Sequence, residues 1–350
     1  MTRKPKGELR RGWTTGACAT AATQAALHAF WGEETPEVSR VTMPRGEVHD
    51  FEVLGVLNGD GWAEARVIKD AGDDPDVTHG AQIVSRVSHS QGGVVFKAGE
   101  GVGTVTKAGL PIPVGDPAIN PVPRQMMCEV VEALARIYKR SPDITIEISV
   151  PNGADLAQKT WNPRLGIKGG LSILGTTGIV RPFSCAAWIA SIHRGVDVAR
   201  ADGLKHVAGC TGATSEACVQ QELALPDHAM LDMGDFAGGL LKYLNKHPIE
   251  RLTIGGGIGK LTKLAQGAVD LHSSRSQVDF EALAEMLGED HPFHEVVCAS
   301  NTALEALTHA PELADLVAQG AQEKAAMLAS EVDVDVIVVS RTGEILGRSS

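Results

Sequence analysis

The chain has 350 residues, of which 43 are acidic and 32 basic, and its formal net charge is −11. No cluster of lysine and arginine is dense enough to follow a phosphate backbone, and aromatic residues make up only 4% of the chain, so nucleic acid is not an expected partner. The six cysteines form no CxxC pair, which indicates reduced thiols and no zinc site. The basic amino terminus lacks the apolar core of a secretory signal, and no apolar run reaches the roughly 18 residues of a membrane span. We therefore expect a soluble cytoplasmic protein.

The first part of the chain, residues 1–160, is predicted to be a strand-rich α+β domain. An alanine-rich helix follows Thr14 and Thr15, either of which is a natural N-cap. The Thr-Thr-Gly turn exposes backbone N–H groups that suit an anion, although simple helix capping is the alternative role. The glycine- and proline-rich residues 99–124 form a long irregular loop, and such loops are usually functional. Alternating apolar residues predict strands at 37–43, 50–57, 62–69, 81–87, 94–97, 103–107 and 143–150, with a helix from 121 to about 140.

The second part, residues 161–350, is predicted to be a Rossmann-like α/β domain with a parallel sheet. Short apolar strands alternate there with helices, which is typical of strands joined by helical crossovers. The predicted strands are 171–174, 206–209, 228–232, 251–254 and 334–340, and the predicted helices begin at 182 or span 215–223, 236–245, 260–272 and parts of 278–330.

The segment KDAGDDPDVTHG, residues 69–80, is the most unusual stretch of the chain. It places four aspartates and one histidine between two predicted strands. Like charges at this density repel one another, so a cation, hydrogen-bond donors or a substrate group should compensate them. The spacing does not match a calcium-binding EF-hand loop. A functional loop and a solvated acidic turn both remain open from the residues alone.

Glycine-rich loops follow four of the predicted strands of the second domain. They read GTTG from Gly175, GCTG from Gly209, DMGD from Asp232 and GGGIGK from Gly255. In open α/β sheets ligands bind outside the carboxyl ends of the strands, so these loops favour a nucleotide-like ligand. The last loop is not a Walker P-loop, because Leu261 stands where serine or threonine is required.

Six blocks taken together resemble the cobalt-precorrin-5B C(1)-methyltransferase family of CbiD type. They are RRGWTTGACATAA, KDAGDDPDVTHG, GEGVGTVTK, PVGDPAINPVPRQM, NPRLGIKGGLSILGTTGIVRPFS and GKLTKLAQGAVDLHS, in this order. The resemblance is dense from about residue 10 to 272 and continues thinly to the end. It implies an enzyme of the anaerobic route to cobalamin that uses S-adenosylmethionine to methylate C1 of a cobalt-bound corrin precursor, giving cobalt-precorrin-6A.

The resemblance also implies roles for individual residues. We expect the glycine loops to bind S-adenosylmethionine, through Gly175, Thr176, Thr177, Gly178, Gly209, Asp232, Gly255 and Gly256, with Asp232 a candidate for the ribose hydroxyls. Capping of a helix is the alternative role of Thr176 and Thr177.

The corrin substrate carries many carboxylates, so an acidic protein must gather cations locally. Candidate substrate-binding residues are Thr14, Thr15, Lys69, Lys107, Arg124 and Arg181, with Arg124 and Arg181 preferred; Arg11, Arg164 and Lys168 lie in the same blocks. Candidate catalytic residues are Asp74, Asp76 and His79, the histidine as a proton carrier or a group that approaches cobalt. A purely structural acidic loop is the alternative. No protein-bound metal is implied, since cobalt arrives with the substrate.

Two other functions compete with methyl transfer. A nicotinamide-dependent oxidoreductase could use the glycine-rich sheet, but the GxGxxG fingerprint is missing. A tetrapyrrole-binding carrier would need no cofactor loops. The sequence leaves a homodimer open.

Overall fold

The computed structural model describes residues 7–349, which divide into two compact units. Unit 1 is Met1–Ser184 and unit 2 is Cys185–Ser350, and each is described by itself. The sequence placed the boundary at residue 160, where the strand–helix rhythm changes. Residues 161–184 instead belong to unit 1, because they supply strands that pair with its earlier strands. Within the described range, no helix is both long enough and apolar enough to cross a membrane.

Unit 1 is built on a five-stranded sheet in the order β4-β5-β6-β9-β7. Neighbouring strands are antiparallel except β7 and β9, which are parallel. Three isoleucines of β9, Ile144, Ile146 and Ile148, are fully buried on one face, as alternation in a half-buried strand requires. The strands are β4 (Gly55–Gly59), β5 (Trp62–Ile68), β6 (Gln82–His89), β7 (Val94–Ala98) and β9 (Ile144–Ser149).

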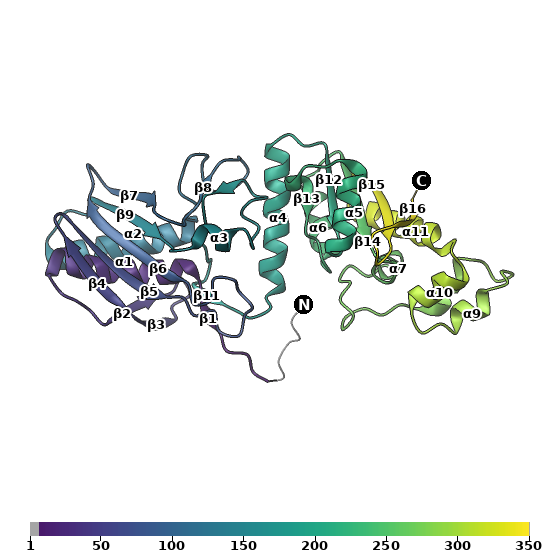
Figure 1. Ribbon diagram of the computed structural model, residues 1–350, viewed down its shortest axis with the longest axis horizontal. Helices are drawn as coiled ribbons and strands as arrows, with labels where there is room; N and C mark the ends of the chain where they lie inside the picture. The colour runs from purple at the N-terminus through teal and green to yellow at the C-terminus, as the bar shows by residue number, and fades with distance from the viewer. Residues whose placement is uncertain (1–6, 350) are drawn as a thin grey trace. The chain divides into compact units, whose positions relative to one another are not determined.

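Two helices of 18 residues each, α1 (Thr15–Gly32) and α2 (Pro121–Tyr138), pack on each other, and α1 covers β5 and β6 (Figure 1). The alanines of α1 are almost completely buried, so its backbone lies close to the sheet. Proline in the first turn of α2 loses no hydrogen bond, because the N–H groups of a first turn have no partner within the helix. The remaining elements are β1 (Gly12–Trp13), β2 (Val38–Thr42), β3 (Val48–Glu52), β8 (Thr104–Val105), α3 (Gly153–Ala157), β10 (Ile167–Lys168) and β11 (Ile179–Val180).

Two sequence predictions for unit 1 were wrong in detail. Residues 50–57 do not form one strand, because β3 ends at Glu52 and β4 begins at Gly55 in a different sheet. Residues 171–174 do not form a strand of a parallel sheet; only isolated bridges join Leu171 to Val102 and Ile173 to Ile119. Leu171 and Ile173 are apolar because they fill the core of unit 1, and a short run of this kind does not distinguish such core residues from a strand.

Unit 2 contains the predicted parallel sheet, with strand order β13-β12-β14-β15-β16. The first four strands are parallel, and β16 is antiparallel to β15. The chain passes from β12 outward to β13 and then returns to β14 on the other side of β12. The sheet therefore has a topological switch point between β12 and β14. The strands are β12 (His206–Cys210), β13 (Met230–Leu231), β14 (Arg251–Gly256), β15 (Asp333–Val339) and β16 (Ile345–Arg348).

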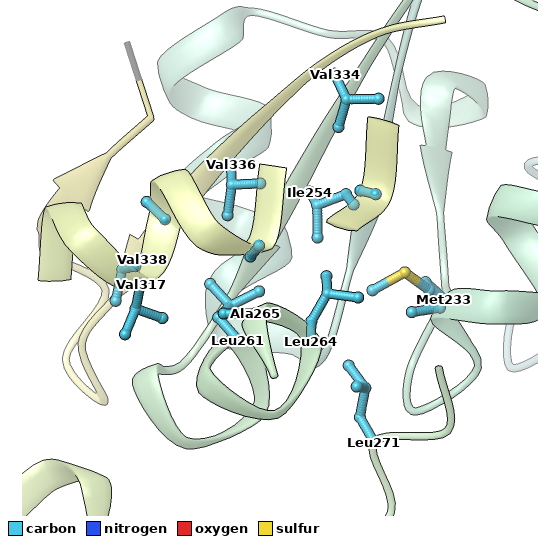
Figure 2. Packing of buried hydrophobic residues seen from close by; sticks show 14 of the residues in the cluster. Met233, Ile254, Leu261, Leu264, Ala265, Leu271, Val317, Val334, Val336 and Val338 are labelled. Atoms are coloured by element: carbon cyan, nitrogen blue, oxygen red, sulfur yellow. The ribbon is translucent and has the colours of Figure 1, made fainter. Parts of the chain in front are cut away.

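The helices of unit 2 cover both faces of this sheet. The larger core lies on the face of α4, α6, α7 and α11, where Leu261 and Leu264 meet Ile254 and Val336 of the sheet (Figure 2). The smaller core lies under α5. The helices are α4 (Cys185–Ala201), α5 (Ala213–Leu223), α6 (Ala237–Leu244), α7 (Ile258–Ala265), α8 (Phe280–Glu285), α9 (His294–Cys298), α10 (Ala303–His309) and α11 (Leu313–Leu328), with a 3-10 turn η1 (Asp227–Ala229). The helix predicted for residues 260–272 is shorter than expected, because Gly267 adopts a positive φ of 92° just after α7.

Candidate functional site

The Thr-Thr-Gly turn of residues 14–16 starts helix α1, and both threonine hydroxyls are used there. Thr14 is the N-cap and its Oγ1 accepts a hydrogen bond from the Ala17 N–H at 3.2 Å. Thr15 Oγ1 accepts a hydrogen bond from the Leu174 N–H at 2.9 Å. Both side chains are buried. Thr14 therefore caps the helix, as the alternative role predicted. Thr15 connects a distant loop to the start of the helix.

That distant loop is the second Thr-Thr-Gly segment, residues 175–178, which lies in unit 1. Its expected place at the carboxyl end of a parallel strand is wrong, because β11 directly after it pairs with β1. A Cβ at Gly175 would lie 2.2 Å from Thr14 Oγ1, and the Thr14 N–H donates to the Gly178 carbonyl at 3.0 Å. Thr176 is exposed and Thr177 Oγ1 accepts a hydrogen bond from the Ile179 N–H at 3.3 Å. The two Thr-Thr-Gly segments, residues 14–16 and 175–178, thus lie side by side at the amino end of α1.

The acidic loop, defined here as residues 69–80, receives its first compensating charge from Arg10. The guanidinium of Arg10 makes a two-pronged ion pair with Asp70, with Nη2 at 2.9 Å from Oδ1. The backbone N–H of Arg10 donates to Asp73 Oδ2 at 2.6 Å. These hydrogen bonds from Arg10, with its charge, lower the pKa of Asp70 to about 2. The sequence analysis missed Arg10, although it stands at the start of the block that contains the first turn.

The second compensating charge is Lys69, whose side chain is only 1% exposed. Its Nζ lies 2.6 Å from Asp76 Oδ2, and Asp76 Oδ1 accepts hydrogen bonds from both the N–H and the hydroxyl of Thr78. Burial acts to raise the pKa of Asp76, but the Lys69 ammonium and these hydrogen bonds outweigh it, so the pKa is lowered. Lys69 and Asp76 are thus an internal ion pair that shapes the loop. The Lys69 ammonium is buried, so it is not accessible for the predicted contact with substrate.

Asp74 joins the acidic loop to the end of unit 1. Its Oδ1 accepts a hydrogen bond from the Phe183 N–H at 2.8 Å. Phe183 adopts a positive φ of 56°, an uncommon conformation for a bulky residue, so this backbone is held by its surroundings. Arg181 lies two residues earlier and its side chain is exposed. The predicted residues Asp74 and Arg181 are therefore brought to one region of unit 1.

His79 has a defined hydrogen-bonding role in the loop. The Ala71 N–H donates to its Nδ1 at 3.1 Å, and the side chain is 53% exposed. Because Nδ1 accepts this bond, the neutral ring carries its proton on Nε2. A metal-binding histidine usually has the opposite arrangement, with the second nitrogen donating to an oxygen. The geometry thus favours His79 as a hydrogen-bond donor over His79 as a cobalt ligand.

The remaining predicted substrate cations have different surroundings. Arg124 donates to the carbonyls of Ile119 and Pro117 and pairs with Asp116 at 3.2 Å, so its donors stabilise the long loop before α2. The stem of Lys107 packs beside Gly166, where a Cβ would approach it within 2.6 Å. Arg124 therefore has a structural role in the loop, whereas the side chain of Arg181 is exposed and can contact a substrate.

The glycines predicted to approach a cofactor in unit 2 are explained mostly by packing. A Cβ at Gly209 would lie 2.5 Å from Leu240, at Gly255 2.6 Å from Val219, and at Gly256 2.8 Å from Thr211. Gly209 and Gly255 are small because helices α6 and α5 lie against the sheet there, and Gly256 is small because Thr211 of the neighbouring loop lies against it. Gly212 and Gly257, which follow them, meet no atom closer than 3.9 Å. The open backbone of these loops therefore lies one to three residues beyond the predicted glycines.

The loop after β13 contains Asp232 and is held by an aromatic side chain. Trp188 of α4 donates from Nε1 to the Asp232 carbonyl at 2.8 Å. Gly234 lies against the indole with a positive φ of 57°. Trp188 is 37% exposed, although a large aromatic side chain gains from burial. The sequence analysis did not select Trp188.

Lys260, the last residue of GGGIGK, connects three loops at the carboxyl edge of the sheet. Its Nζ donates to the Thr211 carbonyl at 2.7 Å, after β12, and lies 3.0 Å from Asp235 Oδ1, after β13. Lys260 itself follows β14. The sequence analysis rejected this segment as a P-loop and therefore left Lys260 unassigned. A lysine directly after a glycine-rich loop was the signal that could have found it.

Chemically, the two regions offer different groups. Unit 1 brings together backbone donors, an exposed histidine donor, an arginine and compensated carboxylates. Unit 2 offers open backbone and one lysine at a topological switch point, where open α/β sheets bind ligands. These groups fit a nucleoside that carries an amino acid, since they provide a cation for a carboxylate and hydrogen-bonding groups for hydroxyls. Among residues 7–349 no cluster of three or more histidine, cysteine or acidic side chains could hold a metal ion.

Comparison with known proteins identifies relatives along almost the whole chain. A protein from Brucella anthropi named cobalt-precorrin-5B C(1)-methyltransferase is 57% identical, over 98% of this chain and 96% of that protein. Proteins of the same name from Brucella canis and Brucella suis are 56% identical with the same coverage. A crystal structure of a cobalamin biosynthesis protein (cbiD) from Archaeoglobus fulgidus is 29% identical, covers 77% of this chain and 84% of that chain, and has a TM-score of 0.42.

Family models give the same assignment at both ends of the chain. The model described as CbiD matches residues 1–182, which is close to the whole of unit 1. The model described as CbiD, C-terminal domain, matches residues 270–350. The resemblance noted in the sequence blocks is confirmed: the chain belongs to the CbiD family.

Proposed function

We propose that this protein is a cobalt-precorrin-5B C(1)-methyltransferase of cobalamin biosynthesis. The observation that carries the proposal is the 57% identity, over 98% of the chain, to a relative of that name. The reaction places a methyl group on ring carbon C1 of a cobalt-bound corrin precursor and gives cobalt-precorrin-6A. The relatives described above carry the name of a methyltransferase and not that of an oxidoreductase or a carrier.

The cofactor in this proposal is S-adenosylmethionine, held at the carboxyl edge of the sheet in unit 2. When bound, it supplies an electrophilic sulfonium methyl group and leaves as S-adenosylhomocysteine. The residues proposed to hold it are Asp232, Lys260 and the open backbone at Gly212 and Gly257. This edge supports the proposal because these groups lie at the switch point of a parallel sheet. Gly209 and Gly255 act indirectly, by letting helices pack closely on the sheet, and Gly256 by making room for Thr211.

The corrin substrate is proposed to lie against unit 1. The Arg181 guanidinium would pair with a substrate carboxylate, and the His79 Nε2–H would donate to a substrate oxygen. Asp74 would hold the backbone at Phe183 and so position Arg181 two residues earlier. No covalent nucleophile is needed for transfer to an electron-rich carbon. The task of these residues is alignment and exclusion of water, which together supply much of the rate in such transfers.

The first test is calorimetric titration of the purified protein with S-adenosylhomocysteine, with NAD as the control ligand. We expect micromolar binding of S-adenosylhomocysteine and no heat from NAD, because unit 2 lacks the GxGxxG fingerprint. Binding of NAD alone would overturn the proposal in favour of an oxidoreductase.

Turnover separates the enzyme from a carrier. Incubation with cobalt-precorrin-5B and S-adenosylmethionine labelled in its methyl group should give a labelled corrin, detected by mass spectrometry as a gain of one methyl group. A protein that binds the corrin but transfers no label, with an active relative as positive control, would be a carrier and not an enzyme.

A further inference from the structure

The Lys260 ammonium is only partly engaged by hydrogen bonds. A lysine ammonium has three N–H groups. One of them donates to the Thr211 carbonyl at 2.7 Å, and Nζ lies 3.0 Å from Asp235 Oδ1 as an ion pair without hydrogen-bond geometry. The Lys260 side chain is 34% exposed at the edge of the sheet. The ammonium therefore has charge-assisted donors left for a ligand.

Asp235 fixes where this ammonium lies. The Asp235 side chain is 7% exposed, and Lys260 is the charged group within ion-pair distance of it among residues 7–349. The Asp235 backbone is itself held, because its carbonyl accepts a hydrogen bond from the Leu271 N–H at 2.8 Å. A nearly buried carboxylate attracts a neighbouring cation more strongly than an exposed one would. Asp235 is thus a positioning residue for Lys260.

The same helix contributes a second anchored lysine. Lys263, one turn after Lys260, is buried and donates to the Leu271 carbonyl. Leu271 is therefore bonded to both Lys263 and Asp235, and the loop after α7 is tied to the loop after β13. This arrangement explains why the block GKLTKLAQGAVDLHS carries two lysines. Lys263 is used internally, and Lys260 is the one left accessible.

The place of Lys260 in the sheet indicates the kind of ligand. Thr211 follows β12 and Lys260 follows β14, so the ammonium spans the switch point, where the chain leaves the sheet toward opposite faces. Backbone at Gly212 and Gly257 is open on this edge. A lone ammonium suits a single carboxylate better than a diphosphate, which proteins bind with several backbone donors or with forked arginines.

We propose that Lys260 binds the α-carboxylate of the amino-acid part of S-adenosylmethionine, and that Asp235 holds Lys260 in place for this contact. The inference rests on the proposed function, because it assumes that this cofactor binds to unit 2. It adds a specific contact that none of the sequence patterns assigned. If this contact exists, Lys260 contributes to the affinity for ligands that carry the carboxylate and not to the affinity for ligands that lack it.

The test compares two ligands that differ in the amino-acid part. S-Adenosylhomocysteine carries the carboxylate, and 5′-methylthioadenosine has the same nucleoside and thioether without it. We expect Lys260→Met to weaken binding of S-adenosylhomocysteine by about 10- to 100-fold, as for loss of a charged hydrogen bond, and to change methylthioadenosine binding less than about twofold. Lys260→Arg should restore part of the loss, and Asp235→Asn should weaken S-adenosylhomocysteine in the same selective way.

Lys242→Met is the matched control, since Lys242 is an exposed lysine of α6 in the same unit. It should bind both ligands like the natural sequence. Thermal unfolding of each variant reports whether unit 2 remains folded. Equal losses of both ligands in Lys260→Met would assign Lys260 a structural role and overturn the inference, and so would unchanged binding of both. If the natural sequence binds neither ligand, the proposed cofactor fails, which is a different result from failure of Lys260 alone.

Discussion

At the scale of single residues, unit 1 depends on a charge that it buries. The Lys69 ammonium is almost completely removed from water and has Asp76 as its counter-ion at 2.6 Å. Such a pair contributes little net stability compared with apolar residues, but removal of one partner leaves a buried charge without compensation. The sequence pointed to this loop as a site because of its aspartates. The structure shows that one of these aspartates, Asp76, has a structural role as the counter-ion of Lys69.

We predict that Asp76→Asn lowers the free energy of unfolding by about 3–5 kcal/mol, measured by urea denaturation, because it leaves Lys69 buried and unpaired. Asp73→Asn is the control. Asp73 is exposed and accepts a bond from the Arg10 N–H, which asparagine can still accept, so the loss should stay below about 1 kcal/mol.

The double variant Lys69→Met with Asp76→Asn should regain part of the lost stability, because no buried charge remains. A double variant as unstable as Asp76→Asn would contradict this account. The pH dependence gives a second readout. The pKa of Asp76 is lowered in the folded state, so its contribution is present above the usual aspartate pKa of about 4 and is lost as the pH falls below it. Asp76→Asn should lack this acid-dependent loss.

At the scale of elements, strand β1 with the residues just before it and the acidic loop approach each other at two glycines. A Cβ at Gly12 would lie 2.0 Å from the Ala71 carbonyl carbon, and one at Gly72 would lie 2.2 Å from the Arg10 carbonyl oxygen. Both positions would force backbone apart. Each glycine therefore leaves room for the backbone of the other segment.

Gly72→Ala and Gly80→Ala form a matched pair for this contact. Both glycines adopt a positive φ, of 66° and 76°, but a Cβ at Gly80 meets no atom within 4 Å. Gly80→Ala should cost about 1–2 kcal/mol for the left-handed backbone alone. Gly72→Ala should cost at least about 1–3 kcal/mol more because of the clash, as measured by chemical denaturation. Equal losses would show that the loop can move away from Arg10.

Element types could be predicted where a pattern is local. The helix after Thr14 and the alternating strand β9 follow from capping and periodicity, and the structure confirms both. The place of residues 175–178 could not be predicted, because it depends on the pairing of β11 with β1, which are more than 160 residues apart in the sequence. The partner of the acidic loop, Arg10, was missed for the same reason. A long-range partner leaves no periodic signal in a single sequence.

At the scale of the whole chain, each unit has its own core and its own sheet. The sequence predicted the fold class of both units, and the mixed α/β architecture confirms it. It placed the boundary too early because the apolar, glycine-rich residues 161–184 resemble the start of an α/β domain. Fold class depends on repeated patterns, whereas a boundary depends on which few contacts a connecting segment makes.

Separate cores predict separate stabilisation by ligand. In differential scanning calorimetry we expect two transitions, and S-adenosylhomocysteine at 100 times its Kd should stabilise one of them by about 2.7 kcal/mol. Tryptophan fluorescence identifies the unit, because Trp13, Trp31, Trp62 and Trp161 belong to unit 1 and Trp188 to unit 2. In a Trp188→Phe variant that still binds S-adenosylhomocysteine in calorimetry, the emission follows unit 1, so its midpoint should not move with ligand. A shift of that midpoint would mean that the units unfold together.

The alanine-rich helix α1 also limits how this protein can change over generations. Alanines at its buried positions have no rotamers to adjust, and every substitution except glycine enlarges the side chain. Random mutation at these codons is therefore expected to be purged whatever the substrate, while the exposed strand faces can drift. A directed-evolution library aimed at other corrins should therefore randomise residues on those tolerant surfaces and leave α1 unchanged.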